Sequence, residues 1–128
     1  MIGNVGSLTA WGILMSGVIA MIEMIINREG FAERVLNAEA PVLVDFRAEW
    51  CGPCRTMSPL LDRLAERHPE VRVVRVNVDA LPELAERYRV SSIPTQMLFR
   101  DGRMAASSVG MRSLEELERM IGKANVQQ

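Results

Sequence analysis

The chain has 128 residues, of which 48% are apolar and 24% charged, and its formal net charge is −1. These values are typical of one globular domain with a substantial core, and the lack of a basic tract excludes the nucleic-acid-binding class. The only two cysteines, Cys51 and Cys54, are too few for a disulfide-stapled secreted module, and with a single histidine they are too few for a structural zinc site within one chain.

The first 22 residues contain no charged side chain, and Glu23 carries the first charge. This change in composition predicts a boundary near residue 20. We expect an uncharged apolar extension over residues 1–20 and a folded domain over residues 21–128.

Three interpretations of this extension stay open. It is a weak membrane anchor, because a helix of about 20 residues spans roughly 30 Å, or an extra helix packed on the domain or on a second copy. Alternatively, it is a non-structural leader that precedes a later methionine start. Any membrane contact is expected only through residues 1–22, and the placement of Arg28 behind them would keep the bulk of the protein cytoplasmic.

Strand and helix signals alternate from residue 21 onward. We expect a short strand over residues 21–26 and then a helix that is capped by Asn27 and runs to about Leu36. Residues 42–46 form an apolar run that only Asp45 interrupts. Such a run is typical of a central strand that is covered on both faces.

The second half of the chain continues the alternation. A helix is expected over residues 54–67, kinked but not ended by Pro59, followed by a strand over 71–78 and a short helix over 82–88.

A hairpin and a final helix complete the predicted elements. Asp101-Gly102 is a turn signal between strands over residues 95–99 and 103–108. Ser113 and Glu116 form a capping box that begins the last helix. The resulting order, βαβαβαββα, predicts an α/β domain in which helices cover both faces of a sheet.

The segment Trp50-Cys51-Gly52-Pro53-Cys54 lies between the central strand and the helix after it. Cys-x-x-Cys is the shortest common spacing at which two thiols on such a turn can close a disulfide reversibly. The start of the helix favours the thiolate of Cys51, which is the nucleophilic form. Cys54 lies one turn further and is placed to resolve a mixed disulfide, while Pro53 restricts the turn.

Asp45 is the other candidate for chemistry in this region. A carboxyl group inside an apolar strand is costly unless it is neutral or hydrogen-bonded. Burial should raise its pKa and make Asp45 a proton acceptor for Cys54. The alternative is a hydrogen-bonded aspartate with a purely structural role.

From about Met21 to Ile121 the chain resembles the thioredoxin family. The matching motifs occur in family order and at family spacing: Val42-Leu43-Val44-Asp45-Phe46, Ala48-Glu49-Trp50-Cys51-Gly52-Pro53-Cys54, Pro59, Val76-Asn77-Val78-Asp79, Ile93-Pro94-Thr95, Phe99, Asp101-Gly102 and Gly110. The resemblance implies the thioredoxin fold, with a mixed central β-sheet and helices on both faces.

The resemblance also implies a protein disulfide reductase in which Cys51 is the nucleophile, Cys54 the resolving thiol and Asp45 the proton acceptor. Arg75 stands where the family has a lysine close to this aspartate. The Ile93–Pro94 bond should be cis and face the cysteines. The implied client-binding residues are Trp50, Gly52, Pro53, Ile93, Pro94 and Gly110.

Further expectations concern partners and location. The resemblance implies no bound cofactor or metal, reduction by thioredoxin reductase, disulfide-containing client proteins, and a cytoplasmic role in electron transport and cell redox homeostasis. Two alternatives stay open, because fold does not decide function. One is a membrane-tethered thiol exchange protein, and the other a binding or scaffold subunit.

Arg47 departs from the family, which often has an aromatic residue at this position. Its cation either lies near the site and favours the Cys51 thiolate, or is simply solvated.

Overall fold

The computed structural model describes residues 22–126. The elements in chain order are β1 (Glu23–Ile25), α2 (Arg28–Phe31), the π-helix η2 (Ala32–Leu36), β2 (Val42–Arg47), α3 (Gly52–Arg67), β3 (Arg72–Asn77), α4 (Pro82–Arg87), β4 (Thr95–Arg100), β5 (Arg103–Val109) and α5 (Leu114–Val126). This order confirms the predicted alternation. The extension over residues 1–20 lies outside the described residues, and none of the helices within 22–126 is long and apolar enough to cross a membrane.

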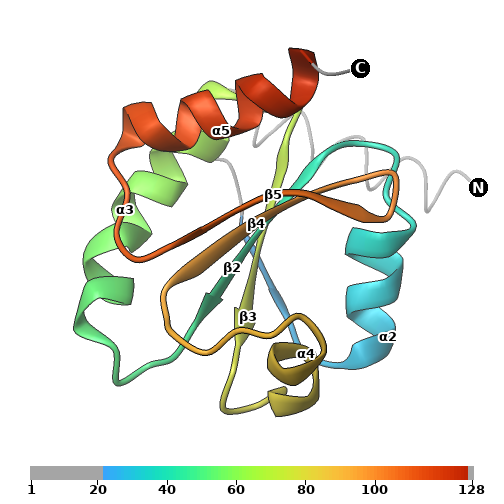
Figure 1. Ribbon diagram of the computed structural model, residues 1–128, viewed down its shortest axis with the longest axis vertical. Coiled ribbons are helices and arrows are strands. Elements are labelled where there is room, and N and C mark those ends of the chain that lie inside the picture. Colours follow the sequence, from blue (N-terminus) through green and yellow to red (C-terminus); the bar gives the residue numbers. More distant parts are fainter. Residues whose placement is uncertain (1–21, 127–128) are drawn as a thin grey trace, which may run out of the picture.

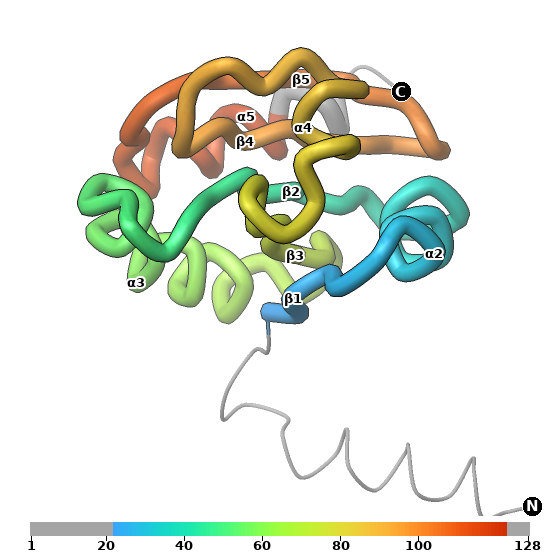
Figure 2. Tube along the Cα trace, turned by 90° about the horizontal axis from the view of Figure 1, so that it is seen from below, coloured from blue at the N-terminus to red at the C-terminus, as the bar shows by residue number. Residues whose placement is uncertain are grey.

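The five strands form one mixed sheet in the order β1-β3-β2-β4-β5. Strands β1, β3 and β2 run parallel to one another, whereas β4 is antiparallel to β2 and β5 is antiparallel to β4. Figures 1 and 2 show α3 and α5 on one side of this sheet and α2 on the other. The predicted fold class is therefore confirmed.

Strand β2 lies in the middle of the sheet, and all six of its residues are buried. Because side chains alternate along a strand, Val42, Val44 and Phe46 pack with the core on the α2 and α4 side. Leu43 packs on the other face with residues of α3 and α5. This second face also receives Asp45, which is two residues further along the strand.

Two helix caps form as predicted. The side chain of Asn27 accepts a hydrogen bond of 2.7 Å from the backbone N–H of Gly30. The N–H of Glu116 donates to Ser113 Oγ (3.1 Å), and the N–H of Ser113 donates to Glu116 Oε1 (2.8 Å). Both contacts satisfy helix N–H groups that have no partner within the helix.

The helix predicted over residues 27–36 differs in its second half. It is α-helical only through Phe31 and continues as a π-helix. The N–H of Asn37 bonds to the carbonyl of Ala32, five residues back, over 2.8 Å. This wider spacing is the hydrogen-bond pattern of a π-helix. The predicted helix over 54–67 begins two residues earlier, at Gly52, and continues through Pro59.

The turn between β4 and β5 requires its glycine for two reasons. Asp101 and Gly102 have φ angles of 53° and 79°, which a two-residue hairpin turn of this kind needs at both positions. A Cβ atom on Gly102 would also lie 2.9 Å from the carbonyl oxygen of Leu36. The turn therefore packs directly against the end of η2.

We expect Gly102→Ala to lower the free energy of unfolding by roughly 1–3 kcal/mol, because it adds both a strained φ and a backbone clash. Chemical denaturation measures this change. Gly122→Ala is the control, since its Cβ meets nothing within 4 Å and alanine favours a helix over glycine by up to about 1 kcal/mol. Equal stability of native protein and Gly102→Ala would contradict this account of the turn.

Candidate active site

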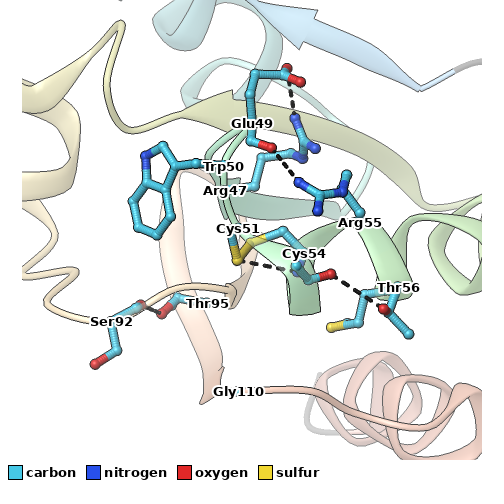
Figure 3. The surroundings of a disulfide bond; sticks show 12 residues. Arg47, Glu49, Trp50, Cys51, Cys54, Arg55, Thr56, Ser92, Thr95 and Gly110 are labelled. Carbon is cyan, nitrogen blue, oxygen red and sulfur yellow. Dashed lines mark hydrogen bonds and ion pairs between the residues drawn. A yellow bond between two sulfur atoms is a disulfide. The ribbon is translucent and has the colours of Figure 1, made fainter.

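The two cysteines lie where β2 gives way to α3 (Figure 3). Cys51 is the N-cap of α3, with extended backbone angles of φ −85° and ψ 111°. A disulfide joins it to Cys54, and their Cα atoms are 5.3 Å apart. The Cys51 sulfur also accepts a hydrogen bond from the backbone N–H of Cys54 (3.2 Å). It thus occupies the place of a capping oxygen, where a helix terminus stabilises negative charge.

Small and apolar groups surround the disulfide. Ala48, Val78 and Ile93 pack around the two cysteines, whose exposed fractions are 4% for Cys51 and 1% for Cys54. Cys54 therefore lies deeper, inside the first turn of the helix. This arrangement limits attack from solvent to the Cys51 side.

Trp50 is not a core residue. It is 68% exposed, and its indole N–H donates a hydrogen bond of 2.8 Å to Asp79 Oδ2 in the loop after β3. This bond fixes the orientation of a large apolar ring that lies open to solvent beside Cys51. Sequence reasoning gave Asp79 no role, and its place in a matching motif was the only signal.

The Ile93–Pro94 peptide bond is cis. The carbonyl of Pro94 accepts a hydrogen bond from the N–H of Gly110 (2.8 Å), so the segments before β4 and after β5 lie together. Gly110 has a φ of 95°, a backbone conformation that favours glycine. Ile93 packs against the two cysteines, and Figure 3 shows Gly110 on the same side of the molecule as the disulfide. The structure thus brings Ile93, Pro94 and Gly110 to the site.

Gln96 is a functional candidate that the sequence analysis missed. It is completely buried, and its amide nitrogen donates to the Gly110 carbonyl (3.1 Å) and to Met57 Sδ (3.4 Å). Its amide oxygen accepts from the hydroxyl of Ser108. Together with Pro94, Gln96 holds the Gly110 peptide from both sides. The signal in the sequence was a glutamine in the predicted strand over residues 95–99, next to three apolar residues.

Asp45 is 1% exposed and lies on the α3 and α5 face of β2. Burial raises its pKa from 3.8 to about 6, and the positive charges of Arg75 and Arg47 oppose this rise. Its Oδ1 atom has no hydrogen-bond partner. The predicted direction of the pKa shift is therefore confirmed, and the cause is loss of hydration.

Arg75 is the strand neighbour of Asp45 in the pairing of β2 with β3. Its guanidinium donates a hydrogen bond to Ser58 and lies 3.5 Å from Asp62 Oδ1, both on α3. The structure thus places Arg75 beside Asp45, as the resemblance implied, with its hydrogen-bonding end turned to α3.

Arg47 corrects one alternative of the sequence analysis. The alternative in which its cation is simply solvated is wrong, because Arg47 is only 7% exposed. Its Nη1 atom pairs with Glu49 Oε2 over 3.2 Å, and Arg55 of α3 donates to the Glu49 carbonyl over 2.7 Å. Figure 3 shows these three side chains grouped on one side of the disulfide, with Ser92 and Thr95 on the other.

In the described residues, no group of three or more His, Cys, Asp or Glu side chains is arranged to hold a metal ion. The chemistry that the described site offers is that of two vicinal thiols, a helix terminus and a buried carboxyl group. Two thiols at a helix terminus, with a buried carboxyl group on the preceding strand, fit thiol–disulfide exchange.

Comparison with known proteins agrees with this geometry. The family model described as Thioredoxin matches residues 23–123. A thioredoxin of Chlamydia trachomatis is 43% identical over 99 residues, which cover 77% of this chain and 95% of that protein. Thioredoxin 1 of Synechococcus elongatus is 47% identical over 81 residues, 62% of this chain and 76% of that one. The solved oxidised structure of mitochondrial thioredoxin 3 from Saccharomyces cerevisiae is similar with a TM-score of 0.74 and 32% identity, covering 80% of this chain and 94% of its own.

We expect Asp45→Asn to stabilise the fold at neutral pH. The folded-state pKa of about 6 exceeds the ordinary value of 3.8, so the folded form binds more protons between these two pH values. The contribution of Asp45 to stability is therefore greatest below about pH 4 and falls as pH rises to about 6. The variant should gain on the order of 2–3 kcal/mol at pH 7–8 and nothing near pH 3.

Urea unfolding at several pH values measures this gain. Asp101→Asn, on an exposed turn, is the control and should change the free energy of unfolding by less than about 0.5 kcal/mol. A gain in Asp45→Asn that is the same at low and neutral pH would contradict the assignment.

Gln96→Leu should loosen the Gly110 segment. The substitution leaves the Gly110 carbonyl without its amide donor, which costs about 1–3 kcal/mol of unfolding free energy. Hydrogen exchange at the Gly110 N–H should become faster. Ser108→Ala is the matched control, because it removes a bond to Gln96 but keeps Gln96 on Gly110. Equal exchange rates in the two variants would show that Gln96 does not hold this segment.

Proposed function

Because the chain belongs to the thioredoxin family and is a protein disulfide reductase, we propose that Cys51 is its nucleophile, Cys54 its resolving thiol and Asp45 its proton acceptor. The observation that carries this assignment is the position of Cys51 as the N-cap of α3, with its sulfur bonded to the Cys54 N–H. That position favours a thiolate on Cys51. Cys54 lies inside the first turn of the helix and is more buried than Cys51, so we assign it to the second step.

The reaction then runs in two exchanges. The Cys51 thiolate attacks one sulfur of a client disulfide, forms a mixed disulfide, and the other client sulfur leaves as a thiolate. Cys54 loses its proton to the carboxylate of Asp45 and attacks the Cys51 sulfur. The Cys51–Cys54 disulfide forms and the second client sulfur leaves. Two electrons have then passed to the client.

Client proteins dock, in this proposal, on the surface around Cys51. This docking surface consists of Trp50, Gly52, Pro53, Ile93, Pro94, Val109 and Gly110. Trp50 and Val109 are 68% and 53% exposed, which supports an apolar contact. We further propose that an extended client segment pairs with the backbone at Ile93.

The oxidised protein has to be reduced before it can act again. We assign this step to thioredoxin reductase and the clients to disulfide-containing proteins, as for the family. A cytoplasmic location fits a dithiol that must stay reduced. A low reduction potential of the Cys51–Cys54 couple supports both assignments, and a high one indicates an oxidant or isomerase instead.

The functional test is reduction of insulin disulfides with dithiothreitol as electron source. Cys51→Ser should fall to the rate without enzyme. Cys54→Ser should instead accumulate a mixed disulfide between Cys51 and an insulin chain, visible as a mass adduct, because it can attack but cannot resolve. An adduct in Cys51→Ser and none in Cys54→Ser would reverse the two roles, and native activity in Cys51→Ser would remove the proposed mechanism.

A further inference from the structure

Two arginines are neighbours of Asp45 in the sheet, Arg47 on β2 and Arg75 on β3. Arg47 is two residues along the same strand, so its side chain leaves the same face of β2 at a Cα distance of about 6.8 Å. Arg75 is the register partner of Asp45 on β3, about 4.8 Å away across the sheet. Arg47 thus follows Asp45 along β2, and Arg75 lies opposite Asp45 on the neighbouring strand β3.

Both cations have their ion-pair partners at the surface. Glu49 pairs with Arg47 and its side chain is 74% exposed, while Asp62 pairs with Arg75 and is 56% exposed. Because the acidic partner of each pair lies in water, solvent screens its attraction to the arginine. The two arginine side chains themselves are mostly buried, at 9% and 17% exposure. The positive charge of each arginine is therefore only weakly neutralised by its acidic partner at the surface.

The unsatisfied polar atoms point to the same cluster. Across the described residues, the buried side-chain nitrogen and oxygen atoms without a hydrogen-bond partner are Arg47 Nε, Arg75 Nε and Asp45 Oδ1. All three belong to this group of charges. In a poorly hydrated interior, opposite charges interact strongly through space even without direct contact. Asp45 is the one anion of the cluster that is buried with both cations.

We propose that Arg47 is a positioning residue for disulfide exchange: its buried guanidinium acts with Arg75 to hold the carboxyl group of Asp45 ionised at neutral pH. This inference rests on the proposed role of Asp45 as proton acceptor. A carboxyl group can take the proton of Cys54 only in its ionised form. Arg47 therefore acts on the chemistry through Asp45 and without touching the sulfurs or the client.

Within residues 22–126, the cations that act on Asp45 are Arg75 and Arg47. Arg55 of α3 is an exposed side chain that donates to the Glu49 carbonyl. Helix α3 contributes the disulfide, Ser58 and Asp62, and the last two bind Arg75. Strand β4 contributes Gln96, the register partner of Asp45 on that side, and its neutral amide is used by Met57, Ser108 and Gly110. The ionisation of Asp45 is thus a balance between burial, which raises its pKa, and the two arginines, which lower it.

The direct test is a titration of the Asp45 carboxyl carbon by NMR in the oxidised protein, where the disulfide keeps both cysteines from titrating. In Arg47→Gln the midpoint should rise by roughly one pH unit, the lower end of the effect of a nearby opposite charge. In Arg47→Lys, which keeps the charge, it should stay near the native value. An unmoved midpoint in folded Arg47→Gln would overturn the proposal; if that variant does not fold, Arg47→Phe replaces it with the same criterion.

A kinetic arm connects the titration to the reaction. Release of client thiol from a preformed mixed disulfide should become faster as pH rises through the Asp45 midpoint. In Arg47→Gln this increase should occur at a higher pH, by the same shift as the titration midpoint. Asp45→Asn, measured alongside, should be slow at all pH values. A native release rate in Asp45→Asn would remove Asp45 from the mechanism. Slow release in Asp45→Asn with an unmoved profile in Arg47→Gln would instead overturn the role of Arg47 alone.

Discussion

The hydrogen bond from the Cys54 N–H to the Cys51 sulfur ties the nucleophile to the end of a helix. To form it, the chain has to leave β2 at Arg47 and begin α3 at Gly52, within the few residues between them. The same connection directs Trp50 outward and packs Ala48 under the disulfide. The placement of the two cysteines therefore depends on one abrupt change from strand to helix. Segments that are distant in sequence, at Ile93 and at Asp79, then pack against this turn.

That change is held in place by burial on both sides of β2. A strand covered on two faces cannot slip by one residue without moving every side chain to the opposite face. Three residues of β2 fill the core on the α2 side, which fixes the register. Asp45 and Arg47 then have to lie beneath α3. The apolar side chains set the register of β2, and this register buries the two charges at a cost in free energy.

Local patterns were sufficient to predict the order of elements, because capping residues, turn residues and apolar runs act over a few positions. The two predicted helix caps form at Asn27 and Ser113, and the predicted hairpin turn forms at Asp101-Gly102. The π-helix over Ala32–Leu36 was not predictable in this way, since it depends on where the chain has to end against the hairpin turn.

Side chains whose surroundings come from other strands were the harder part of the site. The sequence near Arg47 does not indicate whether its cation reaches water, because α3 and the loop around Glu49 decide its burial. Gln96 contacts Met57 of α3, Ser108 of β5 and Gly110 just after β5, and none of them is close to it in sequence. The buried carboxyl group was easier to predict, since an acid in a run of apolar residues is unusual whatever surrounds it.

The glycines of this chain show which requirements come from the fold and which come from outside it. Gly102 needs its positive φ and would clash with a backbone carbonyl, and Gly110 needs its positive φ. Gly52 has neither constraint: its φ is not positive, and a Cβ atom there would meet nothing within 4 Å. The fold therefore accepts a side chain at Gly52. Within the proposed function, a side chain added at Gly52 would lie next to Cys51 on the docking surface, so its effect would fall on client access and not on the fold.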